Sequence, residues 1–184
     1  TTVAKFSPSG NYIASGDEYG RLIVWAWDTP THITKFESRV FAAGLLDIDW
    51  SPDNTKLLLV GDGGSGTMTK VVTADSGNNV GEMVGHNRRA TSCAFKQSRP
   101  FRCMTGGEDN KVVYFKGPPF KMEKTHDYST FVNSVRMSRD GSKAVSVGAD
   151  KTIRFYDPET GDKTESIANA HDGTIYEAAF SPDG

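Results

Sequence analysis

One pattern of short predicted strands recurs along this chain and limits the possible folds more than any other feature. The fullest copy spans residues 132–157. Its segment VNSVRM alternates apolar and polar residues and ends in the turn SRDG, and the strand signals SKAVSVG and TIRFYD follow. Three short strands joined by tight turns predict an antiparallel meander.

The copies follow one another at nearly constant spacing. The last large apolar residue of each first strand marks the copy, and successive markers are 44, 45, 42 and 43 residues apart. These markers are Phe6, Trp50, Phe95, Met137 and Phe180. A fourth strand follows in each complete unit, at HITKF, NVGEMV, FKMEKT and KTESIA. This spacing, with four strands per unit, is typical of the blades of a β-propeller.

The predicted fold is therefore all-β, a partial propeller of about four four-stranded blades. Blades are predicted at residues 1–44, 45–89, 90–131 and 132–174, and residues 175–184 are predicted to begin the next one. A propeller closes when its first and last blades meet, commonly with about seven blades. Four blades leave two terminal faces uncovered, so we expect the 184 residues to be part of a longer chain.

Composition limits the possible partners. The net charge of −2 gives no overall attraction to nucleic acid or to an anionic membrane. No apolar run approaches the roughly 18 residues that span a bilayer. Cys93 and Cys103 are expected to be reduced core thiols, because the sequence shows no secreted disulfide framework. These features predict a soluble, cytoplasmic binding domain.

A basic run in the third unit is the one feature typical of nucleic-acid binding. Its members are Arg88, Arg89, Lys96, Arg99 and Arg102, and Phe95 and Phe101 are interleaved with them. Strand alternation predicts that the two phenylalanines lie in the core and that the cations face solvent. We therefore expect no nucleic-acid partner.

The motifs for catalysis and cofactor binding are missing. The glycine-rich residues 61–67, GDGGSGT, lack the lysine of a phosphate-binding loop and join two antiparallel strands, so we predict a hairpin loop. Asp62 at its base is kept as a candidate for a binding face. His32 stands alone, and no His, Cys or carboxylate spacing matches a metal site. We expect no enzyme activity, cofactor, metal or small-molecule substrate.

The repeat resembles the WD40 repeat. Gly85 and His86 match the pair that opens a WD40 unit, although no unit here keeps Trp followed by Asp. The resemblance implies a buried hydrogen-bonded set in which His86, Thr105 and Asp109 take three places and Phe115 replaces the tryptophan. The same resemblance places Ser146 and Asp150 in the corresponding set of the next unit.

More specific segments are similar to the actin-interacting protein 1 family. They are SRPFR, GGEDN, GPPFK and FVNSVR in that order, with YIASGDEYGRL before them and AHDGTIY after them. The resemblance covers essentially the whole chain, within the first of that family's two seven-bladed propellers. It implies a protein of the actin cytoskeleton that binds actin filaments and cofilin (ADF), speeds filament disassembly and restrains barbed-end growth without catalysis.

The resemblance also implies a set of partner-binding residues. Glu108 and Asp109 match the acidic turn of the family's actin-facing surface, and Met122 and Phe131 match its large apolar residues. Met122 stands where an aromatic residue is usual, and the loop after Asp62 carries small residues where the family has charges. Phe120, Met122, Tyr128 and Phe131 also stand where a plain blade has polar residues, and exposed apolar side chains are typical of protein-binding surfaces.

A different scaffold on the same fold remains an alternative. A generic WD40 interaction protein, such as a ubiquitin-ligase substrate receptor or a subunit of an RNA-processing complex, has the same strand pattern. Such receptors usually close a third strand with WDxR, whereas the corresponding places here read WAWD, ADSG, FKGP and YDPE.

Overall fold

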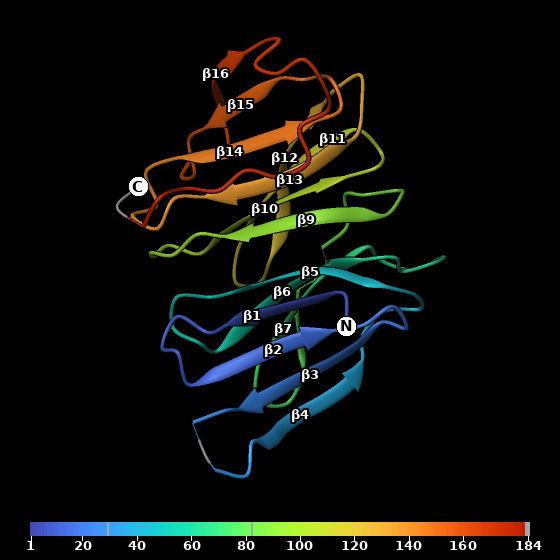
Figure 1. Ribbon diagram of the computed structural model, residues 1–184, viewed down its shortest axis with the longest axis vertical. Helices are drawn as coiled ribbons and strands as arrows, with labels where there is room; N and C mark the ends of the chain where they lie inside the picture. Colours follow the sequence, from blue (N-terminus) through green and yellow to red (C-terminus); the bar gives the residue numbers. More distant parts are fainter. Residues whose placement is uncertain (29, 82, 183–184) are drawn as a thin grey trace.

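The structure is a computed structural model that describes residues 1–28, 30–81 and 83–182. Every secondary-structure element assigned within these residues is a strand, and the strands form four antiparallel sheets of four strands each. Figure 1 shows the sheets stacked one after another along the long axis of the molecule. The predicted all-β fold and its four-stranded units are confirmed.

The four sheets repeat one meander in chain order. The first sheet contains β1 (Val3–Phe6), β2 (Tyr12–Gly16), β3 (Arg21–Ala26) and β4 (Ile33–Arg39). The second contains β5 (Leu45–Trp50), β6 (Lys56–Gly61), β7 (Thr69–Thr73) and β8 (Asn79–Gly81). The third contains β9 (Ala90–Phe95), β10 (Arg102–Gly107), β11 (Lys111–Lys116) and β12 (Lys121–Asp127). The fourth contains β13 (Val132–Met137), β14 (Ala144–Gly148), β15 (Ile153–Tyr156) and β16 (Lys163–Ile167).

Each inner sheet is apolar on both faces. In β6, Leu57 and Leu59 pack into the cluster shared with the first sheet, and Leu58 and Val60 pack into the cluster shared with the third. All four side chains are fully buried. Successive residues of a strand point to opposite faces, so this uninterrupted apolar run requires a covering sheet on both sides.

A buried carboxylate links the innermost strands of all four sheets. Asp47 of β5 is 6% exposed, and its Oδ2 accepts hydrogen bonds from Ser92 Oγ at 3.1 Å and Cys93 N at 3.0 Å in β9. Arg136 of β13 donates to the same oxygen over 2.9 Å. Lys5 Nζ of β1 lies 3.4 Å from Oδ1. One side chain therefore positions three neighbouring sheets relative to its own.

Residues after the fourth sheet, where the next blade is predicted to begin, lie beside the fourth sheet. Ile175 N donates to Gly148 O over 3.1 Å, and Asn133 Nδ2 donates to Ile175 O over 2.8 Å, so this segment lies beside β13. No strand is assigned around Phe180 within the described residues. Residues 183–184 lie outside the described residues.

Two predictions of exposure were wrong. Phe120 is fully buried, and Lys96 is only 2% exposed. Phe120 turns inward against Phe95, with ring centroids 5.7 Å apart. Lys96 forms an ion pair with Glu159 in the turn between β15 and β16, because the fourth sheet covers this side of the third. A neighbouring sheet changes which positions face solvent, and strand periodicity alone does not contain that information.

Cys93 and Cys103 are both buried and free, as expected. Burial raises the pKa of each thiol well above its ordinary value. Both cysteines therefore remain protonated and pack as small apolar side chains. None of the described residues forms a helix long and apolar enough to cross a membrane.

Replacing Asp47 by alanine is expected to lower the free energy of unfolding by about 3 to 5 kcal/mol, because Arg136 and Lys5 would lose the carboxylate that compensates their charges. Urea denaturation at neutral pH measures the change. The exposed Asp172 provides the control, and its replacement by alanine is expected to change stability by less than about 0.5 kcal/mol. Equal effects of the two substitutions would contradict the linking role of Asp47.

Candidate protein-binding face

Most of the predicted site residues lie at one end of the strands, on the turns and connections of the four sheets. We call it the upper face and define it by the turns that follow the second strand of each sheet, at residues 17–20, 62–68, 108–110 and 149–152. The fourth strands end at the same edge, because each sheet is antiparallel throughout. The connections to the next sheet therefore also contribute to the upper face.

The structure brings His86, Thr105 and Asp109 together beneath this face. His86 Nδ1 lies 2.9 Å from Asp109 Oδ1, and His86 Nε2 lies 2.8 Å from Thr105 Oγ1. Asn87 N donates to Asp109 Oδ2 over 3.0 Å. The set joins the segment that enters the third sheet to the turn between its middle strands, so it fixes the conformation of that turn.

Asp109 is placed to hold the turn and not to contact a partner. Its side chain is 2% exposed, and both carboxylate oxygens accept hydrogen bonds within the set. Burial raises the pKa of the Asp109 carboxyl, but the hydrogen bonds from His86 and Asn87 outweigh it, and the pKa lies below its ordinary value. The carboxylate is therefore charged at neutral pH.

Glu108 provides the accessible charge of this turn. Its side chain is 30% exposed, and one oxygen accepts a hydrogen bond of 2.6 Å from Arg89 Nη2. This hydrogen bond raises the pKa of Arg89, and the charge of the nearby Asp62 contributes to the same shift. Asp62 Oδ1 itself accepts from Gly64 N in the hairpin loop. The upper face thus carries two acidic groups around one arginine.

Phe131 lies at the junction between the third and fourth sheets. It is 46% exposed and directly precedes Val132. Ala149 N donates a hydrogen bond to Phe131 O over 3.1 Å, so the connection that carries Phe131 lies against the turn that follows β14. An exposed aromatic ring therefore stands on the upper face.

Met122 lies elsewhere. It pairs with Phe115 near the beginning of β12, far along the strand from the upper face, and it is 52% exposed. Its Sδ accepts a hydrogen bond of 3.4 Å from Thr125 Oγ1. The sequence placed Met122 and Phe131 in one anchor, whereas the structure places them at opposite ends of β12.

The fourth sheet replaces the expected set with two contacts that share Tyr128. Tyr128 stands four residues before β13, as His86 does before β9, and its hydroxyl lies 2.6 Å from the hydroxyl of Tyr156. That hydroxyl is also 2.8 Å from Ser146 Oγ. Burial raises the pKa of Tyr156, so its hydroxyl remains protonated. Asp150 instead pairs with Arg154, whose guanidinium carbon lies 3.9 Å from the centroid of the Tyr128 ring.

Sequence reasoning missed Tyr128 and the hydrogen bonds that Trp25 and Tyr156 form with the second-strand serines. Trp25 Nε1 donates to Ser15 Oγ over 3.0 Å in the first sheet. Trp25, Phe115 and Tyr156 each stand ten residues after the Ser or Thr of the second strand, so they occupy one repeat position. Tyr128 stands in the fourth sheet where His86 stands in the third, but no spacing in the sequence reveals it. Its partner Tyr156 also replaces the usual residue, so the motif is lost at both positions.

The described residues contain no group of three or more His, Cys, Asp or Glu side chains that could hold a metal ion. The upper face presents a carboxylate on a turn of the third sheet, with a cation and an aromatic ring on the connections that enter and leave that sheet, and such groups are typical of protein-binding surfaces.

Comparison with known proteins identifies the kind of repeat that the chain contains. The family model described as WD domain, G-beta repeat, matches residues 1–26 and 119–157. Together with the four repeated antiparallel sheets, this match shows that the chain contains WD40 repeats and has the fold of a partial β-propeller.

Individual relatives make the resemblance more specific. The chain is 44% identical over 184 residues to WD repeat-containing protein 1 of Bos taurus, an alignment that covers 98% of this chain and 30% of that protein. It is 43% identical to the Gallus gallus protein of the same name, with the same coverage. It is 42% identical over 178 residues to Actin-interacting protein 1-2 of Arabidopsis thaliana. That alignment covers 95% of this chain and 29% of the Arabidopsis protein.

These matches confirm the resemblance to the actin-interacting protein 1 family across nearly the whole chain. The chain spans about 30% of the length of the curated relatives that it matches.

Replacing Asp109 by asparagine is expected to lower the free energy of unfolding by about 1 to 3 kcal/mol at pH 7, because His86 and Asn87 would lose a charged acceptor. The folded-state pKa of Asp109 is lowered, so this stabilisation is present above the ordinary value of 3.8 and is lost as the pH falls through the folded-state pKa. Urea denaturation from pH 7 to pH 3 should show the difference from wild type shrinking at the acidic end.

The control for this pH series is Asp127→Asn, whose carboxylate is 75% exposed and lies 3.7 Å from Lys111 Nζ. It is expected to change stability by less than about 0.5 kcal/mol throughout. If the cost of Asp109→Asn did not depend on pH, the charged form of Asp109 would not be the stabilising one.

Proposed function

We propose that this chain forms part of an actin-filament-binding surface in a protein that promotes cofilin-dependent filament disassembly and caps barbed ends. The proposal rests chiefly on the collinear similarity to a relative named actin-interacting protein. It places the protein with actin filaments in the cytoplasm, and it assigns no catalytic step, small-molecule substrate, nucleic acid or membrane to the chain.

The upper face supplies the contacts in this proposal. Phe131 is the apolar anchor, because its exposed ring loses water when a partner covers it. Glu108 exchanges its ion pair with Arg89 for a cation of actin or cofilin, and Asp62 adds to the acidic potential that orients the approach. Asp109 contributes by holding the turn. Met122 makes a separate contact at the outer edge of the third sheet.

Cofilin dependence follows from differential affinity. A protein shifts the balance between intact and disassembled filaments only if it binds one state more tightly than the other. We propose that the upper face binds the cofilin-altered filament more tightly than the bare one. Surface complementarity alone then drives disassembly, with no bond made or broken by this chain.

A generic WD40 interaction scaffold remains the second candidate. The observation that favours it is the fold itself, which serves many unrelated partners. Its upper face would then bind a different protein, and cofilin would have no effect on binding to actin.

Co-sedimentation with actin filaments, with and without cofilin, tests the proposal in the full-length protein that contains this chain. Wild type is expected to pellet more strongly with cofilin-decorated filaments. Glu108→Ala and Phe131→Ala are each expected to weaken that binding. Because Phe131 is the central anchor, its truncation is expected to reduce the free energy of binding by about 2 kcal/mol or more, which is roughly 30-fold in affinity.

Ile33→Ala is the matched control, because Ile33 is 50% exposed and begins β4, at the end of the strands opposite the upper face. It is expected to leave co-sedimentation unchanged, and all three variants are expected to keep the thermal stability of wild type. Cofilin-independent pelleting of wild type would favour the generic scaffold. Equal losses for Ile33→Ala and Phe131→Ala would reject the upper face as the site.

A further inference from the structure

The turn between β2 and β3 presents an exposed tyrosine on the upper face, on a sheet that the contacts described so far do not use. Tyr19 is 68% exposed, and Glu18 beside it is also exposed. An exposed aromatic ring and a carboxylate are the same kinds of group that Phe131 and Glu108 bring to the upper face from the connections and turns of the third sheet.

The repeat explains why the Tyr19 side chain is not needed to hold its own turn. Counted from the Ser or Thr of the second strand, Tyr19 takes the place of Asp109, which holds the turn of the third sheet. The next residue has a positive φ in both turns, 75° at Gly20 and 66° at Asn110. In the first sheet Asp17 holds the turn instead, because its Oδ1 accepts a hydrogen bond from Tyr19 N at 2.9 Å. The Tyr19 ring is thereby left to face solvent.

The turn that carries Tyr19 is held in place by the connection from the first sheet to the second. Val40 N donates to Gly20 O over 2.8 Å, and Leu45 N donates to Asp17 O over 3.0 Å. A Cβ on Gly20 would lie 2.4 Å from Phe41 O, so this connection packs directly against the turn. Because the backbone is already ordered, little of its conformational entropy remains to be lost when a partner covers Tyr19.

The Tyr19 ring borders open space. It forms one wall of a hollow of about 330 Å³, and Arg21, Glu37 and Arg39 line the rest. Arg21 pairs with Glu37, and Arg39 Nε donates to Tyr19 O over 3.1 Å, so both cations are engaged within the chain. The ring is therefore the group that this hollow offers to a partner.

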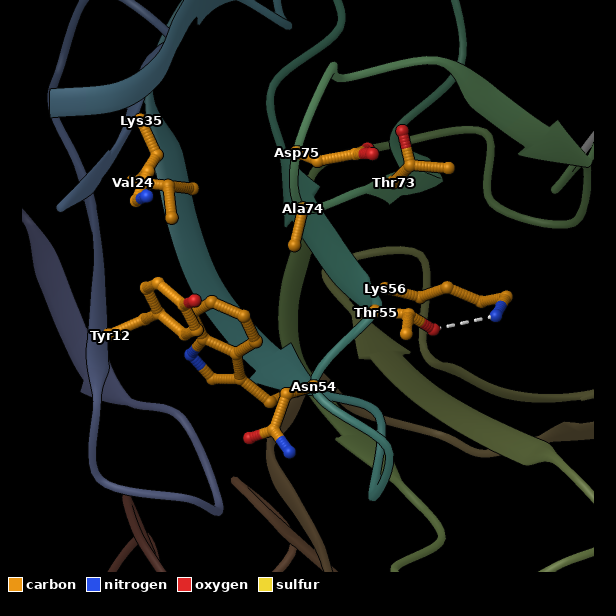
Figure 2. A pocket seen from close by; sticks show the side chains of 10 residues that line it. Tyr12, Val24, Lys35, Asn54, Thr55, Lys56, Thr73, Ala74 and Asp75 are labelled. Atoms are coloured by element: carbon orange, nitrogen blue, oxygen red, sulfur yellow. Dashed lines mark hydrogen bonds between the residues drawn. The ribbon is translucent and has the colours of Figure 1, made fainter. Parts of the chain in front are cut away.

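Tyr12, the other tyrosine of the first sheet, has a packing role that Tyr19 lacks. It lies in the groove between the first and second sheets, at the end of the strands opposite the upper face (Figure 2). Its ring stacks on that of Trp50, with centroids 6.4 Å apart and planes inclined by 23°. Contact between sheets accounts for Tyr12, whereas the 68% exposure of Tyr19 leaves most of its surface to be covered by another molecule.

A stable protein interface needs more surface than the third sheet alone supplies at the upper face. Specific interfaces bury about 800 Å² on each partner and involve about 20 to 30 residues a side. A partner seated on Glu108 and Phe131 therefore reaches over the turns of neighbouring sheets. In the second sheet, residues 63–67 carry only Gly, Ser and Thr, so this loop places no large side chain between the third sheet and the first.

We propose that Tyr19 and Glu18 extend the actin-binding surface across the second sheet to the first, so that the cofilin-decorated filament covers the Tyr19 ring. This inference rests on the proposed function. Tyr19 supplies a second apolar anchor besides Phe131, because a tyrosine ring offers a large contact area with few rotatable bonds. Glu18 takes the repeat position of Glu108 and adds to the negative potential that favours a basic surface on the partner.

Co-sedimentation of the full-length protein with cofilin-decorated actin filaments measures the contribution of the first sheet. Tyr19→Ala is expected to weaken binding about tenfold or more, as the loss of an anchor does. Tyr19→Phe keeps the ring and is expected to bind as wild type does. Glu18→Gln is expected to weaken binding at low ionic strength and to match wild type at high ionic strength, because salt screens an exposed charge.

The matched control is Ile33→Ala, since Ile33 is an exposed apolar residue of the same sheet at the other end of the strands. It is expected to leave binding unchanged, and every variant is expected to keep the thermal stability of wild type. Wild-type affinity of Tyr19→Ala, with Phe131→Ala still weakened, would overturn the extension and leave the proposed function standing. Pelleting of wild type that does not depend on cofilin would reject the proposed function and the extension with it.

Discussion

A four-stranded sheet with two apolar faces must be covered on both, and this requirement organises the whole molecule. The leucine run of β6 faces the first sheet with alternate residues and the third sheet with the others. Burial at about 25 cal/mol per Å² makes such stacking the dominant stabilising contribution. The Asp47 carboxylate then selects one arrangement among the possible stackings, because its hydrogen bonds reach β9 and β13 and its ion pair reaches β1.

This packing explains why recognition is assigned to the ends of the sheets. The faces are used in stacking, and the strand ends carry short turns whose side chains need not pack. In the third sheet, the set of His86, Thr105 and Asp109 holds such a turn rigid and leaves Glu108 at its tip. A turn ordered in advance loses little entropy when a partner binds.

The sequence predicted the repeat, the strands and the three members of the buried set, because each depends on local periodicity or on a fixed spacing. It did not predict that Phe120 and Lys96 are buried, since both are covered by a neighbouring sheet. It joined Met122 to Phe131, although β12 separates them along its length. The tyrosine pair of the fourth sheet was also missed, because two positions changed together and removed the motif. The information lost in each case concerns contacts between units.

The most direct test of the account is hydrogen–deuterium exchange of the full-length protein, alone and with cofilin-decorated actin filaments. The account holds that stacked sheets form a rigid frame and that the upper face is the part that meets the filament. It predicts new protection at residues 106–110 and 129–133 with decorated filaments, and no change along the outer strand β16. Protection spread over the outer strands, with none on the turn that carries Glu108, would contradict it.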